Sequence, residues 1–238
     1  MPKAVQSIAS FHQAEPVPAD GGSEGCSGPG RILLKVFEAL DRANILYCVT
    51  HGYETLPQRI TSSDTDLLIS ANVGSRQLAV LLYENGLGGT RGELVCHRGY
   101  YMIFAGRNAD GSPCFLELDF ALDYKLGYLR FYTGKQVVER RRRYNPFWVP
   151  APALEFGCYL VRRVAKRHLD AVHGQRLSGL YERDRVGCQQ QIARFWGARR
   201  SALIASAARS GNWDPVRRLL VPLRIEMRAG QWSGTPGV

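Results

Sequence analysis

Two aspartates in an otherwise apolar segment, DTDLLIS over residues 64–70, restrict the fold of this chain more than any other feature. The segment predicts a β-strand, and because strand side chains alternate, Asp64 and Asp66 must point to the same face. Two like charges held side by side are costly unless a cation neutralises them. We therefore expect a cation at this strand, and we expect Asp64→Asn or Asp66→Asn to stabilise the ligand-free protein.

A third carboxylate, Asp119, stands in a later predicted strand, CFLELDF over residues 114–120. If this strand lies beside the first, three carboxylates gather, which is the oxygen donor set that Mg²⁺ takes together with waters and substrate phosphates. Two metals at such a site can hold the attacking and leaving oxygens of a nucleotidyl transfer. Glu117 shares the strand face with Asp119 and is either a fourth ligand or a flanking polar residue. A lone Asp-x-Asp motif also marks solvated strand ends, so both interpretations stay open here.

The segment ILYCVT, residues 45–50, predicts a strand that leads into His51, Gly52 and Tyr53. A glycine at a strand end lets a phosphate approach the backbone closely. His51 is a candidate base or phosphate donor, or a residue that completes the loop.

The ordered set of Gly52, Asp64-Thr65-Asp66 and Asp119 resembles the nucleotidyltransferase superfamily typified by DNA polymerase beta. Its pattern is an apolar strand ending in Gly-Gly or Gly-Ser, a spacer, Asp-x-Asp, and a later strand with a third Asp. Residues 47–69 look especially like a bacterial branch whose nucleotidyltransferase domain precedes a helical tail, and residues 149–168 look like the start of that tail. The resemblance covers roughly residues 31–185 and implies an α+β fold, with a nucleotidyltransferase-type mixed β-sheet flanked by helices and then an all-helical C-terminal domain.

The resemblance also implies a site. Its catalytic and metal-binding residues would be Asp64, Asp66 and Asp119, with Mg²⁺ in a two-metal site and a nucleoside triphosphate, such as ATP, as substrate. The nucleotide would be bound by His51, Gly52, Tyr53, Ser63 and Lys166. Tyr53 departs from the Gly or Ser of the family; its hydroxyl can contact a phosphate but cannot sit as close. Ser62 and Ser63 are candidate substitute donors, or simply the turn into the strand.

Lys166 lies in a predicted long helix, residues 153–172, where it shares a face with Tyr159, Arg163 and Asp170 by three- and four-residue spacing. In related nucleotidyltransferases a basic residue of the helical part reaches the triphosphate, so Lys166 is the first candidate. Arg162 and Arg163 are lesser ones, and a solvated helix face is the alternative.

Charge is divided unevenly along the chain, whose formal net charge is +10. Residues 1–135 hold 12 Lys and Arg against 14 Asp and Glu, and residues 136–238 hold 19 against 7. This asymmetry favours an anionic partner, although many single arginines are merely solvated. The segment KQVVERRRRY, Lys135–Tyr144, predicts a short basic helix. Its densest charge run, Glu139–Tyr144, is either a contact for nucleic-acid phosphates or a solvated helix end, and the second is favoured, so nucleic acid is a less favoured partner.

Three regions are expected along the chain: a flexible Gly/Pro/Ser-rich tail over residues 1–30, an α/β domain over 31–148, and a helical domain over 149–238. Asp123 is expected in a turn and residues 145–152 in a proline-punctuated linker. The six cysteines form no paired motif and no stretch is long and apolar enough to span a membrane, so we expect no disulfides, no membrane span and a cytoplasmic location.

The sequence thus predicts a Mg²⁺-dependent nucleotidyltransferase that moves a nucleotidyl group from a nucleoside triphosphate to a hydroxyl or phosphate acceptor. The candidate acceptors are a sugar, a small molecule and a protein. The alternative is a catalytically inactive protein of the same fold, which uses its basic half to hold a nucleic acid or a partner enzyme.

Overall fold

The computed structural model describes residues 26–60, 64–70, 73–86, 93–144 and 146–232. Its centre is a five-stranded sheet of β1 (Tyr47–Val49), β2 (Thr65–Ile69), β3 (Glu93–Arg98), β4 (Tyr101–Arg107) and β5 (Pro113–Ala121), in the order β1-β2-β5-β4-β3. β2 and β5 run parallel and the other neighbours antiparallel, so the sheet is mixed.

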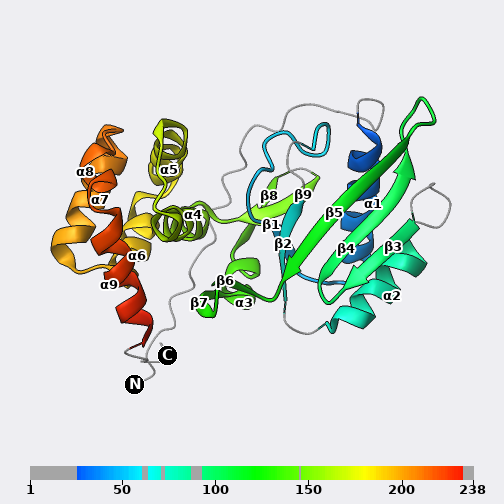
Figure 1. The fold of residues 1–238 in the computed structure, drawn as a ribbon, viewed down its shortest axis with the longest axis horizontal. Coiled ribbons are helices and arrows are strands. Elements are labelled where there is room, and N and C mark those ends of the chain that lie inside the picture. Colours follow the sequence, from blue (N-terminus) through cyan, green and yellow to red (C-terminus); the bar gives the residue numbers. More distant parts are fainter. Residues whose placement is uncertain (1–25, 61–63, 71–72, 87–92, 145, 233–238) are drawn as a thin grey trace, which may run out of the picture.

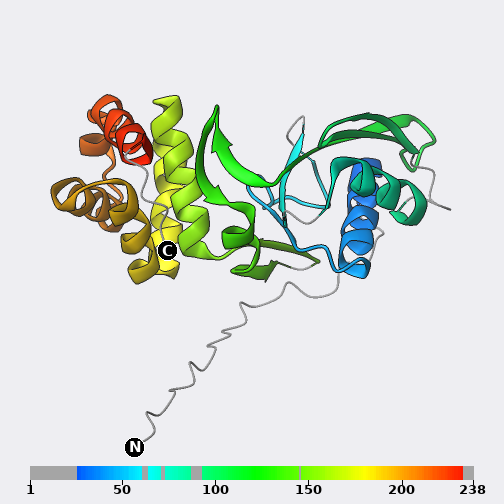
Figure 2. The ribbon, with the colours of Figure 1, turned by 90° about the horizontal axis from the view of Figure 1, so that it is seen from below.

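Two helices, α1 (Gly28–Arg42) and α2 (Ser75–Gly86), pack on one face of this sheet (Figures 1 and 2). In α1 the predicted apolar stripe is buried, with Leu33, Val36 and Leu40 fully inaccessible to solvent. The helix begins earlier than residue 31, because the Ser27 side chain caps its first turn by accepting from the Gly30 N–H. Residues 1–25 of the predicted tail lie outside the described residues.

Two hairpins follow the sheet: β6 (Asp123–Leu126) with β7 (Leu129–Thr133), and β8 (Arg141–Tyr144) with β9 (Phe147–Pro150). The short helix α3 (Gly134–Val138) lies between them in sequence. The predicted basic helix over Lys135–Tyr144 was therefore wrong in part, because only residues 134–138 are helical. The predicted linker over 145–152 was also wrong in part, because Phe147–Pro150 form a strand. The arginine run pairs with Phe147–Pro150 instead, and Phe147 and Val149 are buried.

The C-terminal region is helical, as predicted, and forms the other end of the molecule (Figure 1). It consists of α4 (Pro152–Lys166), α5 (Ala171–Arg183), α6 (Arg185–Phe195), α7 (Ala198–Ser210), α8 (Asp214–Arg217) and α9 (Leu220–Trp232). α4 is shorter than the predicted helix over 153–172, because Arg167 adopts a left-handed conformation and Asp170 caps α5. The observed architecture is the expected α+β class, with a mixed sheet, flanking helices and a helical C-terminal region.

A second hydrophobic core joins this helical region to the hairpin before it. Phe131, Tyr132 and Val137 belong to the same buried cluster as Phe156 and Leu160 of α4. α4 therefore lies between the first hairpin, β6 and β7, and the helices α5, α6 and α9 (Figures 1 and 2). Five cysteines are unpaired: Cys26, Cys48, Cys114, Cys158 and Cys188. Within the described residues, no helix is both long enough and apolar enough to cross a bilayer.

Candidate active site

The three aspartates predicted to share a site do lie together. Asp66 of β2 stands directly opposite Asp119 of β5 in the parallel register, and Asp64 lies just before β2. Thr65 between them is 3% exposed and occupies the other face, as strand alternation requires. One carboxylate oxygen from each aspartate lies within 4.8 Å of the other two.

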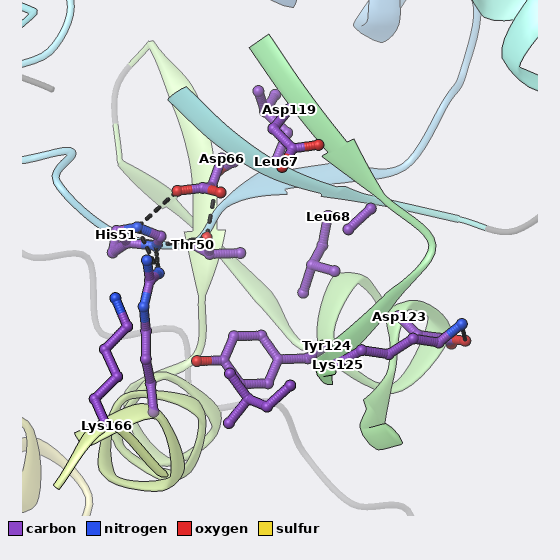
Figure 3. A pocket seen from close by; sticks show the side chains of 13 residues that line it. Thr50, His51, Asp66, Leu67, Leu68, Asp119, Asp123, Tyr124, Lys125 and Lys166 are labelled. Atoms are coloured by element: carbon purple, nitrogen blue, oxygen red, sulfur yellow. Dashed lines mark hydrogen bonds and ion pairs between the residues drawn. The ribbon is translucent and has the colours of Figure 1, made fainter. Parts of the chain in front are cut away.

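A cavity of about 240 Å³ opens beside this triad (Figure 3). The sheet supplies Asp66 and Asp119, and the loop after β1 supplies His51. From α4 come Lys166, which lies across the cavity from the aspartates, and Arg162, whose Nη1 lies 2.7 Å from His51 Nε2. The remaining lining comes from the end of β1, from β2 and β5, and from the first hairpin: Thr50, Leu67, Leu68, Ala121, Asp123, Tyr124, Lys125 and Leu126.

The cavity thus separates an acidic wall from a basic one. Arg162 and Lys166 are four residues apart, which places both on one face of α4. The pKa of Lys166 is lowered, first by the nearby positive charge of Arg162, then by partial burial and by Arg163. An anion between these side chains would relieve that repulsion.

His51 connects the two walls. Its Nε2 lies 2.7 Å from Asp66 Oδ2 and 2.7 Å from Arg162 Nη1, and its Nδ1 lies 2.9 Å from Thr50 Oγ1. When Nε2 carries a proton it donates to Asp66, and without that proton it accepts from Arg162. The imidazole can therefore make one of these two contacts fully at a time.

The two facing carboxylates differ in their electrostatics. Burial alone would raise the pKa of Asp66, but the hydrogen bond and charge of His51, together with Arg162 and Lys166, lower it below its usual value. The pKa of Asp119 is raised, by burial first and then by the negative charges of Asp66 and Asp64. The unrelieved negative charge of the triad therefore falls on Asp119.

The remaining predicted nucleotide contacts are placed differently. Gly52 and Tyr53 are not among the residues that line the cavity; Tyr53 is 3% exposed and its hydroxyl donates to Glu155 of α4 at 2.7 Å. Ser63 lies outside the described residues. Glu117 accepts a hydrogen bond from the Tyr101 hydroxyl and does not line the cavity.

Sequence reasoning missed or misplaced several lining residues. Asp123, expected in a turn, begins β6 and faces the cavity, with Lys125 Nζ 3.4 Å from its carboxylate. Arg162, a lesser candidate, faces the cavity together with Lys166, whereas Arg163 points away and donates to His173. The four-residue spacing of Arg162 and Lys166 was the available signal.

His168, Asp170 and His173 form a second cluster, whose ligand atoms lie within 4.8 Å of one another. Both ring nitrogens of His173 are already engaged, Nδ1 with Tyr159 and Nε2 with Arg163. The Arg163 guanidinium, 2.6 Å from Nε2, also puts a positive charge where a cation would bind. This cluster therefore does not compete with the aspartate triad as a metal site.

Comparison with known proteins gives distant structural similarities. No protein-family model matches the chain, and no curated protein matches it. An antigenic nucleotidyltransferase-like protein from Paracoccidioides brasiliensis is similar at 17% identity and a TM-score of 0.46, over 84% of this chain and 94% of that chain. JHP933 from Helicobacter pylori is similar at 8% identity and a TM-score of 0.42, over 85% and 90% of the two chains. These likenesses are too remote to carry a function, which has to be argued from the residues of this chain.

Proposed function

We propose that this chain is a Mg²⁺-dependent nucleotidyltransferase, which moves a nucleotidyl group from a nucleoside triphosphate to a hydroxyl or phosphate of an acceptor. The observation that carries the proposal is the charge across the cavity, where Asp66 and Asp119 face Arg162 and Lys166. A metal-bound triphosphate has the matching pattern, since its cation seeks carboxylates and its phosphates seek cationic side chains.

The aspartates suit a hard divalent cation. Carboxylate oxygens that share one Mg²⁺ lie about 3–4 Å apart, because each stands about 2.0–2.1 Å from the ion. One carboxylate oxygen each from Asp64, Asp66 and Asp119 lies within 4.8 Å of the other two, which is close enough for a small shift to bring all three onto one ion. When bound, the metal would neutralise charge on the triphosphate oxygens.

Transfer requires a new bond from the acceptor oxygen to the α-phosphorus and loss of the bond to the leaving pyrophosphate. With a hydroxyl acceptor, a proton must also leave the attacking oxygen. We assign Asp119 as its acceptor, because this carboxylate has the raised pKa of the triad and is the most exposed of the three.

For the phosphates we assign His51, Lys166 and Arg162. His51 contacts both Asp66 and Arg162, and the positive charge of Arg162 helps to lower the pKa of Asp66. His51 and Arg162 therefore lie where the phosphates of a bound nucleotide need partners. Gly52 adopts a positive φ of 69° next to His51, which allows the chain to turn sharply behind the cavity.

A nucleic acid is not the acceptor that the chain favours. The guanidinium groups of Arg141 and Arg143 lie 4.5 and 4.8 Å from the centre of the Trp148 ring, and Arg143 also pairs with Asp41. The densest basic run is thus partly occupied by packing within the protein. A sugar, another small molecule or a protein remains as the acceptor class.

The proposal is tested by thermal denaturation of the full chain with each nucleoside triphosphate, in Mg²⁺ and in EDTA. Saturating ligand at about 100 times its Kd should stabilise the native state by about 2.7 kcal/mol. The gain should require Mg²⁺ and should disappear in Asp66→Asn. The matched control is Asp123→Asn, which removes another carboxylate of the same cavity that lies outside the triad.

Measuring pyrophosphate release with panels of hydroxyl acceptors then distinguishes a nucleotidyltransferase from an inactive binding protein of the same fold. Release that depends on Asp119 supports transfer. Stabilisation by nucleotide and Mg²⁺ without release for any acceptor would favour the inactive binding protein of the same fold.

A further inference from the structure

A polar network around the buried carboxylate of Glu155 connects α4, α5, β8 and the loop after β1. Glu155 of α4, 1% exposed, accepts from the Tyr53 hydroxyl at 2.7 Å and from Arg176 of α5 at 2.8 Å. Arg142 of β8 lies 3.9 Å from the same carboxylate and donates to the Tyr53 oxygen at 3.3 Å. Arg176 also pairs with Glu54, 2.6 Å away.

The network holds the loop after β1 through the side chain of Tyr53. Gly52 has φ of 69°, a left-handed conformation that side-chain-bearing residues rarely adopt. The residue before it, His51, faces the cavity, and the residue after it, Tyr53, faces the network. The backbone turn at Gly52 therefore directs His51 toward the cavity and Tyr53 toward the network.

Helix α4 contacts the side chains of both residues that flank Gly52. Glu155 and Arg162 are seven residues apart on α4, which is two helical turns and returns to nearly the same face. The loop thus meets α4 at two points: Tyr53 on Glu155, and His51 on Arg162. A loop fixed at two points on a rigid helix keeps a constant distance from it.

We propose that Tyr53 is a positioning residue, whose hydroxyl fixes the loop after β1 on Glu155 and so sets the position of His51 relative to Arg162 and Lys166 at the cavity. The inference rests on the proposed function, since its consequence is the affinity for a metal-bound triphosphate. The tyrosine acts through the loop, because its hydroxyl is directed into the network and its side chain is buried.

The test compares the full-length wild type with Tyr53→Phe, Glu155→Gln and the double variant. Tyr144→Phe is the matched control, because its ring packs edge-on against Tyr53 at 4.9 Å and the substitution is identical. Two quantities are measured: hydrogen exchange of residues 50–56 without ligand, and the Kd for ATP with Mg²⁺.

Tyr53→Phe should speed exchange in residues 50–56 while leaving α7 unchanged, and should weaken ATP binding about tenfold, the scale of one hydrogen bond to a charged group. Tyr144→Phe should do neither. In the Glu155→Gln background the tyrosine change should weaken binding less, because the amide is a weaker acceptor for the same hydroxyl.

Two results would overturn the positioning role. One is unchanged exchange at residues 50–56 in Tyr53→Phe. The other is an equal loss of affinity in both backgrounds, because the hydroxyl would then act on the nucleotide directly. If the wild type binds no nucleoside triphosphate, the proposed function fails instead, while the exchange experiment still decides whether Tyr53 holds the loop.

Discussion

Asp66 and Asp119 stand opposite each other in register on parallel strands, yet their pKa values are shifted in opposite directions. Asp66 reaches His51 and the positive charges of α4, whereas Asp119 faces mainly the other two carboxylates. Sequence alone suggests mutual repulsion at each aspartate. The structure shows instead that one member of the pair is compensated and the other is not.

Asp119→Asn should stabilise the ligand-free protein at neutral pH, by about 0.5 kcal/mol, because solvent screens much of the repulsion at this exposed position. The folded-state pKa of Asp119 is raised, so its cost is fully present above that pKa and is lost as pH falls through it. Urea denaturation in EDTA at pH 7 and at pH 3 should therefore show the gain at the higher pH alone. A gain that persists at pH 3 would contradict this cause.

Asp66→Asn should destabilise the ligand-free protein, by about 1 kcal/mol, because the carboxylate loses a charge-assisted contact with His51. Its folded-state pKa is lowered, so the stabilisation is present above the usual aspartate pKa and is lost as pH falls toward the folded value. This prediction is the opposite of the expectation from sequence, that replacing Asp66 stabilises the protein. The same urea denaturation series measures this loss of stability. A gain in stability at pH 7 would instead support the expectation from sequence.

Lys166→Ala should leave ligand-free stability within about 0.5 kcal/mol, as for most surface substitutions. The side chain is exposed and stands beside Arg162, whose charge it repels. The same variant should weaken binding of a nucleoside triphosphate by Coulombic loss, and more so at low salt. Titration of ATP with Mg²⁺ at two ionic strengths measures the effect. Equal affinity for variant and wild type would remove Lys166 from the phosphate site.

Two glycines in neighbouring helices should respond oppositely to alanine. In α4 a Cβ on Gly157 would collide with the Tyr132 hydroxyl, so Gly157→Ala should cost about 1–3 kcal/mol as overpacking. In α5 a Cβ on Gly179 meets nothing within 4 Å, so Gly179→Ala should stabilise by up to about 1 kcal/mol through helix propensity. Thermal denaturation of the pair tests the packing of α4 against β7. A stabilising Gly157→Ala would mean that this packing is looser than described.

Local patterns were sufficient to predict α1 and the two strands, β2 and β5, that carry the aspartates. The apolar stripe of α1 and the alternation in β2 and β5 are set by nearest neighbours along the chain, so residues 31–42, 65–69 and 114–120 were predicted in the correct elements. The shared face of Asp64 and Asp66 follows from strand geometry alone. That β5 lies directly beside β2 is a long-range pairing, which the resemblance to nucleotidyltransferases suggested and local pattern could not.

Tertiary contacts determine the parts of the structure that were not predicted from the sequence. Arg141, Arg142 and Arg143 have no strand pattern of their own; they form β8 because β9 pairs with them and because Trp148 packs against two of their guanidinium groups. The burial of Tyr53 depends on Glu155, which is 102 residues away in the chain. Neither contact has a local signal, so neither could be predicted from residue spacing.

The central claim, that Asp64, Asp66 and Asp119 hold a divalent cation, is tested most directly by titrating Mn²⁺ into the full chain with ATP and following free Mn²⁺ by electron paramagnetic resonance. ATP alone gives the reference for metal held by the nucleotide. Wild type and Asp123→Asn should remove further Mn²⁺ from solution, whereas Asp66→Asn and Asp119→Asn should remove much less, because each lacks one hard ligand. Equal uptake by all four proteins would contradict the account.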